Sequence, residues 1–138
     1  MDKYSRAILA DAKKEYTKQL IKFLIKPIYT GIKSIYDTAY DIGKVKNINI
    51  LKTFQLILSK TPKWDEKRLE KEAIRIKKDC DCDYLEDLIT AVFVTHTKIL
   101  IAIKTKGTSQ SIDLNVPKIS YFIHKIYMQC ARNFWRQP

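Results

Sequence analysis

The chain has 138 residues, 46% of them hydrophobic, with only three Gly and four Pro. This length and composition exclude a disordered linker and predict one helical domain over residues 1–138. The 26 Lys and Arg exceed the 15 Asp and Glu, which leaves a net charge of +11. That charge favours an anionic partner: nucleic acid, an acidic protein surface or an anionic membrane face. The codon bias of an AT-rich genome would produce the same lysine-rich composition.

The start of the chain and its cysteines limit the compartment. The segment MDKYSRA has no apolar signal-peptide core, so we expect a protein that is not secreted. Cys80, Cys82 and Cys130 are odd in number, which argues against a disulfide framework and favours a reducing compartment.

The first predicted helix runs from Lys3 to Lys26 with an apolar stripe at helical spacing. Its lysine ridge repeats every four residues and consists of Lys14, Lys18, Lys22 and Lys26. The ridge is either a solvated face or a surface that contacts phosphates or an acidic partner. Pro27 is expected to end or kink this helix and to open a second one to about Ile42, which Gly43 stops.

Two shorter helices are predicted next. Asn47 or Asn49 caps a third helix that runs to about Lys60. The Thr61-Pro62 pair supplies a capping hydroxyl and a first-turn proline, so it predicts the start of a fourth helix to about Lys78. Because the apolar stripe of this fourth helix is thin, we expect it to be peripheral or an exposed docking element.

Residues 84–104 form the most apolar predicted helix. Its stripe consists of Leu85, Leu88, Ile89, Val92, Phe93, His96, Ile99, Leu100 and Ile103. A helix this apolar must be covered by protein or by lipid. Charged and polar residues interrupt it, and such groups are costly inside a bilayer, so we expect a core helix and no membrane span.

The carboxyl-terminal part contains a polar loop and a last helix. The loop is Gly107–Ser111, after which Ile112 and Leu114 alternate with polar residues as in a short extended piece. Pro117 opens a helix to about Arg136 with a regular apolar face. The chain is therefore predicted to be all-α, a single compact domain of about five to six amphipathic helices packed around a central buried helix (84–104).

Residues with catalytic or metal-binding chemistry are few. Cys80 and Cys82 could contribute to a zinc site only if Cys130 and a histidine joined them in the fold, and zinc-type spacing is absent. His96 is expected to be a core histidine, and His124 an ordinary surface residue. The sequence contains no glycine-rich phosphate loop and no hydrolase or metalloprotease signature. We therefore predict a protein that is not an enzyme and has no metal or other cofactor.

Two stretches near the chain ends carry a family resemblance. They read ILADAKKEYTKQLIKFLIKPIYTGIKSIYDTAY over Ile8–Tyr40 and ISYFIHKIYMQCARNFWRQP over Ile119–Pro138. Within them the most similar positions are Tyr16–Leu20, Ile28–Tyr36, Ile126–Tyr127, Cys130–Arg132, Phe134–Trp135 and Pro138. Together the stretches resemble a family of uncharacterised proteins of nucleocytoplasmic large DNA viruses, the giant viruses.

This resemblance implies a viral protein, located in the virion or in the host cytoplasm or viral factory. A small basic helical protein of this kind fits a minor, capsid-associated virion component that binds acidic surfaces of other virion proteins. Its expected contacts are the lysine ridge and an aromatic–arginine anchor formed by Tyr127, Arg132, Phe134 and Trp135, residue types enriched at interface centres. Core packing is the alternative for the anchor. The alternative function is nucleic-acid binding or genome packaging, although no recognition-helix or RNA-binding aromatic pattern is found.

Overall fold

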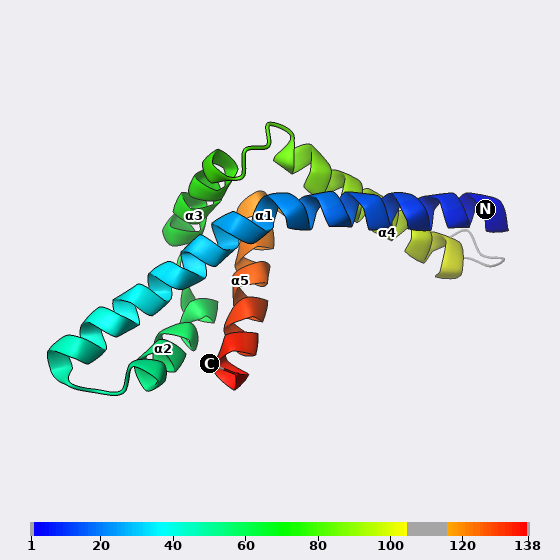
Figure 1. The fold of residues 1–138 in the computed structure, drawn as a ribbon. Coiled ribbons are helices and arrows are strands. Elements are labelled where there is room, and N and C mark those ends of the chain that lie inside the picture. The colour runs from blue at the N-terminus through cyan, green and yellow to red at the C-terminus, as the bar shows by residue number, and fades with distance from the viewer. Residues whose placement is uncertain (1, 105–115, 138) are drawn as a thin grey trace. The chain divides into compact units, whose positions relative to one another are not determined.

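The computed structural model describes residues 2–104 and 116–137. These residues form five α-helices and one short 3-10 helix, and no strand occurs among them, which confirms the predicted all-α class (Figure 1). The elements are α1 (Lys3–Lys46), α2 (Ile50–Leu58), η1 (Thr61–Lys63), α3 (Glu66–Asp79), α4 (Leu85–Lys104) and α5 (Ile119–Arg136). The predicted polar loop Gly107–Ser111 and the extended piece at Ile112 and Leu114 lie outside the described residues.

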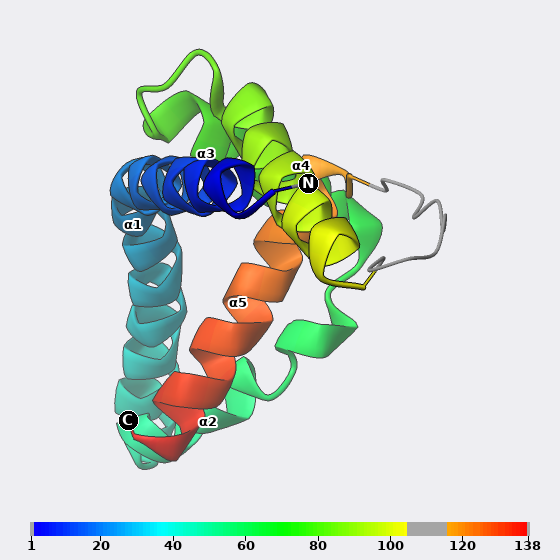
Figure 2. The same ribbon diagram turned by 90° about the vertical axis from the view of Figure 1, so that its right-hand side faces the viewer.

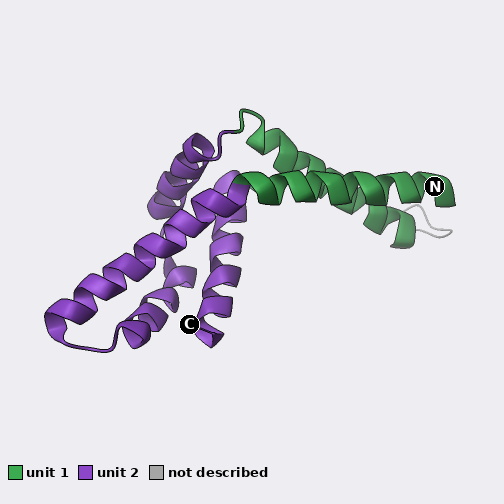
Figure 3. Cartoon of the chain, viewed as in Figure 1, with its two compact units in different colours: residues 1–23, 82–117 green, residues 24–81, 118–138 purple. Residues whose placement is uncertain are grey.

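The chain divides into two compact units (Figure 3). Unit 1 consists of residues 1–23 and 82–117, and unit 2 of residues 24–81 and 118–138. Helix α1 contributes to both units, because the boundary falls within it. That residues 1–138 form one domain stays a prediction.

Unit 1 is built from the first half of α1 and from α4. Asp2 caps α1, since its Oδ1 accepts a hydrogen bond of 2.6 Å from the Ser5 amide. The two helices run antiparallel, because the Phe23 ring packs edge-on against Tyr84 and Lys13 Nζ lies 2.9 Å from His96 Nδ1.

Helix α4 is buried over a shorter length than the sequence predicted. Leu85, Leu88 and Ile89 are buried as expected. From His96 onward the described side chains are half-buried or exposed, and Ile103 is 59% exposed. The central burial expected for residues 84–104 is therefore corrected to the amino-terminal half. The reason is coverage: in the described part of unit 1, α1 is the helix that packs on α4.

Unit 2 has its core around α5, which packs against α3, α2 and η1 (Figure 2). The second half of α1 contributes an apolar stripe with the spacing of one helix face. The buried core residues are Leu24, Ile28, Ile32, Ile35 and Ala39 of α1, Phe54 and Leu58 of α2, Leu69, Ala73 and Ile76 of α3, and Ile123, Tyr127 and Ala131 of α5. Helix α3 was expected to be peripheral, but its thin apolar stripe is fully buried in this core.

Pro27 lies inside α1, so of the two expectations at this position, an end or a kink, the end is wrong. Proline lacks the amide hydrogen that would bond to the carbonyl of Phe23, four residues earlier. The helix continues because buried leucines and isoleucines fix it on both sides of the proline, Leu24 and Ile28 being the nearest. The boundary between the two units falls in the same turn, after Phe23.

Gly43 does not stop the helix either, because α1 continues to Lys46. Asn47 adopts a left-handed conformation with φ of 54°, and the Ile48 amide donates to the Gly43 carbonyl at 3.0 Å. This is a Schellman ending with asparagine in the position usually held by glycine. Gly43 is instead needed for close approach, since a Cβ there would lie 2.8 Å from Ile50 Cγ1.

The predicted start of α2 is confirmed, and the predicted start of α3 is wrong. Asn49 caps α2, as one of the two expected asparagines, by accepting from the Lys52 amide at 3.1 Å. The Thr61-Pro62 pair starts only the single turn of η1. Helix α3 begins four residues later, where Asp65 Oδ1 accepts from the Arg68 amide at 2.8 Å. Trp64 lies between η1 and the Asp65 cap and has an extended backbone, so the helical conformation does not continue from η1 into α3.

In the part of the chain that the structure describes, no helix combines the length and the apolar character needed to cross a bilayer.

Candidate functional site

A polar cluster joins α1, α3 and α5 inside unit 2. Arg75 Nη2 donates to Glu72 Oε2 at 2.9 Å, to the Tyr127 hydroxyl at 3.0 Å and to the Pro27 carbonyl at 3.0 Å. The Tyr127 hydroxyl donates in turn to Glu72 Oε2 at 2.8 Å. Arg75 also pairs with Asp79 at 3.3 Å. The charged groups of the cluster are thus partnered by residues from three helices.

The protonation properties of the cluster indicate a structural role. Burial opposes ionisation of Glu72, but hydrogen bonds from Arg75 and Tyr127 outweigh it and lower the pKa of the carboxyl group. Burial, followed by the bond to Glu72, raises the pKa of Tyr127 well above its usual range. A carboxyl group with a lowered pKa and a phenol with a raised pKa are both poorly suited to proton transfer near neutral pH. The hydrogen bonds of the cluster hold α1, α3 and α5 together.

Gly31 makes room for this cluster. A Cβ at position 31 would collide with the Tyr127 hydroxyl and would lie 2.8 Å from its Cζ. Tyr127 is 1% exposed, and the Trp64 ring packs at a tilt with its centroid 5.1 Å away, so the phenol ring has little space into which to move. The glycine is therefore required by packing in the interior of a helix, where it would otherwise be unfavourable.

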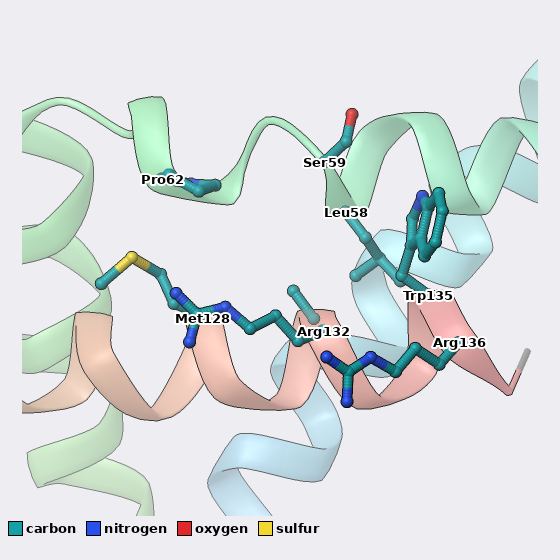
Figure 4. A pocket seen from close by; sticks show the side chains of 8 residues that line it. Leu58, Ser59, Pro62, Met128, Arg132, Trp135 and Arg136 are labelled. Atoms are coloured by element: carbon teal, nitrogen blue, oxygen red, sulfur yellow. The ribbon is translucent and has the colours of Figure 1, made fainter.

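A groove of about 420 Å³ lies between α5 and the segment formed by α2 and η1 (Figure 4). Its lining residues are Leu58, Ser59, Pro62, Met128, Ala131, Arg132, Trp135 and Arg136. Leu58 and Ala131 are buried at 1% and 5% exposure and form an apolar floor. In Figure 4, Trp135 stands beside Leu58 at one end of the groove, whereas Pro62 and Met128 face each other at the other end. The two arginine side chains lie along the α5 side.

The walls of the groove carry positive charge without carboxylates. From Ile42 to Trp64 and from Leu114 to Pro138 the sequence contains no Asp or Glu. All Lys and Arg of these two segments are exposed: Lys44, Lys46, Lys52, Lys60, Lys63, Lys118, Lys125, Arg132 and Arg136. Within the described residues, no ion pair is formed at either groove arginine. The groove therefore offers apolar surface next to uncompensated positive charge.

The structure separates the four residues of the predicted aromatic–arginine anchor. Arg132 and Trp135 line the groove, and Trp135 is 53% exposed. Phe134 points elsewhere and packs on Phe54, with ring centroids 6.3 Å apart. Tyr127 belongs to the polar cluster, so its expected role as a contact residue is corrected to core packing. The reason is the helical period, which places residues 127, 131 and 134 on the inner side of α5.

The lysine ridge is exposed along its whole length, as a solvated or binding face requires. Steps of four residues turn by about 40° around an α-helix, so the ridge winds around α1 and does not follow one line. Lys14 and Lys18 border a shallow hollow of about 640 Å³ in unit 1, whose apolar residues include Ile21 and Ile99. Lys22 belongs to unit 1 and Lys26 to unit 2.

The remaining chemical candidates have packing roles. Cys80 ends α3 as its capping residue, and both Cys80 and Cys82 are buried. Residues 2–104 and 116–137 contain no group of three or more His, Cys, Asp or Glu placed to hold a metal ion. Burial raises the pKa of the Cys130 thiol.

Both histidines differ from expectation. His96 is exposed and its Nδ1 contacts Lys13 of α1, so it is not a core histidine. His124 stacks on Trp64 and lies 2.9 Å from the Thr61 carbonyl oxygen. Because a carbonyl oxygen only accepts, His124 Nε2 carries the hydrogen in this contact.

The sequence did not lead us to predict Arg136 or the residues of α2 and η1 that line the groove opposite α5. Arg136 lies one helical turn after Arg132, and this spacing could have predicted a pair on one face of α5. The absence of Asp and Glu around both helices is a second signal that can be read from the sequence. Leu58 and Pro62 could not have been assigned to the groove, because only the packing of α2 and η1 on α5 brings them there.

Fold and surface together define the class: a small, basic, all-α protein with a groove between two carboxylate-free helices. The chain belongs to DUF5764, a family of unknown function, whose model matches residues 6–138. No curated protein matches the chain. No solved structure matches it either.

Proposed function

We propose that this protein is a non-enzymatic structural or interaction protein of a virus particle. In this proposal it is a minor, capsid-associated component that binds acidic surfaces of other virion proteins. The resemblance of Ile8–Tyr40 and Ile119–Pro138 to giant-virus proteins supports the viral setting, with a location in the virion or in the host cytoplasm or viral factory.

The observation that carries the proposal is the distribution of charge. The net charge is +11, and the two segments without carboxylates keep all their Lys and Arg exposed. Arg75 pairs with Glu72 and Asp79 inside the polar cluster, so this cation is used within the fold. Positive charge that the fold does not use internally favours association with an anionic macromolecule.

Nucleic-acid binding is the second candidate, because exposed Lys and Arg also neutralise phosphates. The two candidates differ in salt dependence. A phosphate binder loses affinity steeply, with a log–log slope of about −0.9 for each phosphate neutralised on duplex DNA. We expect the purified protein to shift duplex DNA only weakly above physiological salt. Tight, sequence-selective binding under those conditions would overturn the structural role.

Two experiments test the proposal directly. The first asks by mass spectrometry whether the protein is present in purified virus particles, and whether it separates with the shell or with the genome. We expect the shell; absence from particles, or recovery with the genome alone, would contradict the proposal.

The second experiment reverses charge on the lysine ridge. Lys18→Glu combined with Lys22→Glu is expected to leave helix content and Tm unchanged, because both side chains are exposed. The same variant should weaken the recovery of cross-linked shell proteins. Unchanged recovery would remove the ridge from the interface, and loss of folding would show that the ridge is not a solvated face.

A further inference from the structure

The groove of unit 2 has walls that are held in place. Gln55 of α2 donates from Nε2 to the Trp135 carbonyl oxygen at 2.8 Å, which satisfies an otherwise open carbonyl near the end of α5. At the preceding position of each helix, Phe54 packs on Phe134, with ring centroids 6.3 Å apart. Contacts of this kind fix the spacing between α2 and α5. The groove is therefore a preformed feature of unit 2, which lowers the cost of binding a ligand.

The lining residues define the chemistry of a ligand. Arg132 and Arg136 are four residues apart on α5, so their guanidinium groups lie on the same face of the helix. Guanidinium groups bind carboxylates through paired, charge-assisted hydrogen bonds. Pro62 and Met128, above the floor of Leu58 and Ala131, make the groove surface mainly apolar, and Trp135 offers a flat, half-exposed ring. A complementary ligand combines an apolar side chain with carboxylates spaced by one helical turn.

We infer that this groove binds an acidic amphipathic helix of another protein, with an apolar side chain on the Leu58–Ala131 floor and two carboxylates on Arg132 and Arg136. This inference rests on the proposed function, because it names the partner surface that an interaction protein of this charge would recognise. Trp135 closes one end of the bound segment, in the manner of aromatic residues at the centres of interfaces.

Two other occupants fit the groove less well. A second copy of this chain would also carry a charge of +11, so association through a basic face would be repulsive. A nucleic acid would engage the arginines through its phosphates but would leave the apolar floor without a complementary contact. Charge and floor together favour the acidic helix.

The test uses a fluorescein-labelled amphipathic peptide of about 15 residues, long enough to form a helix. It carries two glutamates one turn apart beside leucine and phenylalanine, and a second peptide has glutamine in place of both glutamates. Fluorescence anisotropy with the full chain should show binding of the acidic peptide, with affinity about tenfold lower for the glutamine peptide. Absence of binding to the acidic peptide would overturn the inference.

Variants of the protein locate the site. Arg132→Glu combined with Arg136→Glu, and separately Trp135→Ala, should each weaken peptide binding by about tenfold or more. The matched control is Lys67→Glu combined with Lys71→Glu, which has the same charge change and spacing on α3 but lies outside the groove lining. The control should bind the peptide like the original protein. Equal losses in the control and the groove variant would show general charge attraction and would contradict the site.

The same variants separate this inference from the proposed function. If the groove variant still recovers cross-linked shell proteins from particles, the groove assignment fails and the proposed function stands. If labelled duplex DNA binds the groove with a steep salt slope and the acidic peptide does not, the nucleic-acid alternative replaces the acidic helix. Circular dichroism and Tm of each variant confirm that binding is compared between folded proteins.

Discussion

Unit 2 holds arginines in two contrasting environments, the polar cluster and the groove. The Arg75 side chain is 28% exposed and is bonded to two carboxylates, a phenol and a backbone carbonyl. Arg132 and Arg136 are exposed, and their helix contains no Asp or Glu. Net charge alone is therefore a poor guide to binding. Arg75 stabilises the packing of three helices, whereas the groove arginines leave their charge available to a partner.

The largest expected effect on stability comes from a substitution at Gly31 that fills the space of the Tyr127 hydroxyl. Gly31→Ala normally favours a helix, but here the new methyl group would displace the Tyr127 hydroxyl from Glu72 and Arg75. We expect a loss of about 3 kcal/mol in the free energy of unfolding, from overpacking and broken hydrogen bonds. Chemical denaturation followed by circular dichroism measures it.

A double-mutant cycle with Tyr127→Phe sharpens this prediction. Removing the hydroxyl relieves part of the collision, so Gly31→Ala should cost less in the Tyr127→Phe background than alone. Additive losses would show that position 31 and the phenol do not interact, and the cluster would then not explain the glycine.

The next effect contrasts the two environments directly. Arg75→Ala leaves Glu72 partly buried without its cation, and we expect a loss of about 2 kcal/mol in the free energy of unfolding. Arg132→Ala removes an exposed side chain and should change it by less than about 0.5 kcal/mol. Similar losses from the two substitutions, measured by urea denaturation, would abolish the distinction on which the groove assignment depends.

The smallest effect concerns pH. Because the folded protein lowers the pKa of Glu72, this group stabilises the fold above its ordinary pKa, and the contribution is lost as the pH falls. Glu72→Gln should cost about 1 kcal/mol at neutral pH, and the difference from the original protein should shrink below about pH 4. Glu70→Gln, at an exposed position of the same helix, is the control and should show little difference at any pH. A constant difference for Glu72→Gln across this range would contradict the ionised cluster.

Much of the helical architecture could be predicted from local patterns. The apolar period placed helices over the described α-helical segments, with α1 predicted as two helices, and Asn49 was one of two asparagines expected as a cap. The boundary errors lie at Pro27, Gly43 and Thr61-Pro62, where a strong local signal did not determine where a helix begins or ends. An interior proline removes one backbone hydrogen bond and destabilises a helix, and here the packing of buried side chains on both sides of Pro27 offsets that cost.

The candidate site was predictable in part. Arg132 and Trp135 were expected as contact residues, and they line the groove. Tyr127 and Phe134 were grouped with them, because the sequence does not distinguish an aromatic residue of the core from one that contacts a partner. Tyr127 is buried in the core, whereas Phe134 is 41% exposed and packs on Phe54, because different sides of α5 meet α3 and α2.

By itself the sequence determined the helices, the excess of positive charge and its concentration in two segments without carboxylates. These properties follow from residue spacing and composition, which are local. Only the tertiary structure decided which charges are used internally. Arg75 meets Tyr127 across 52 positions of the chain, and Pro27 across 48. A contact between residues so far apart arises from the packing of whole helices, and no short-range pattern encodes it.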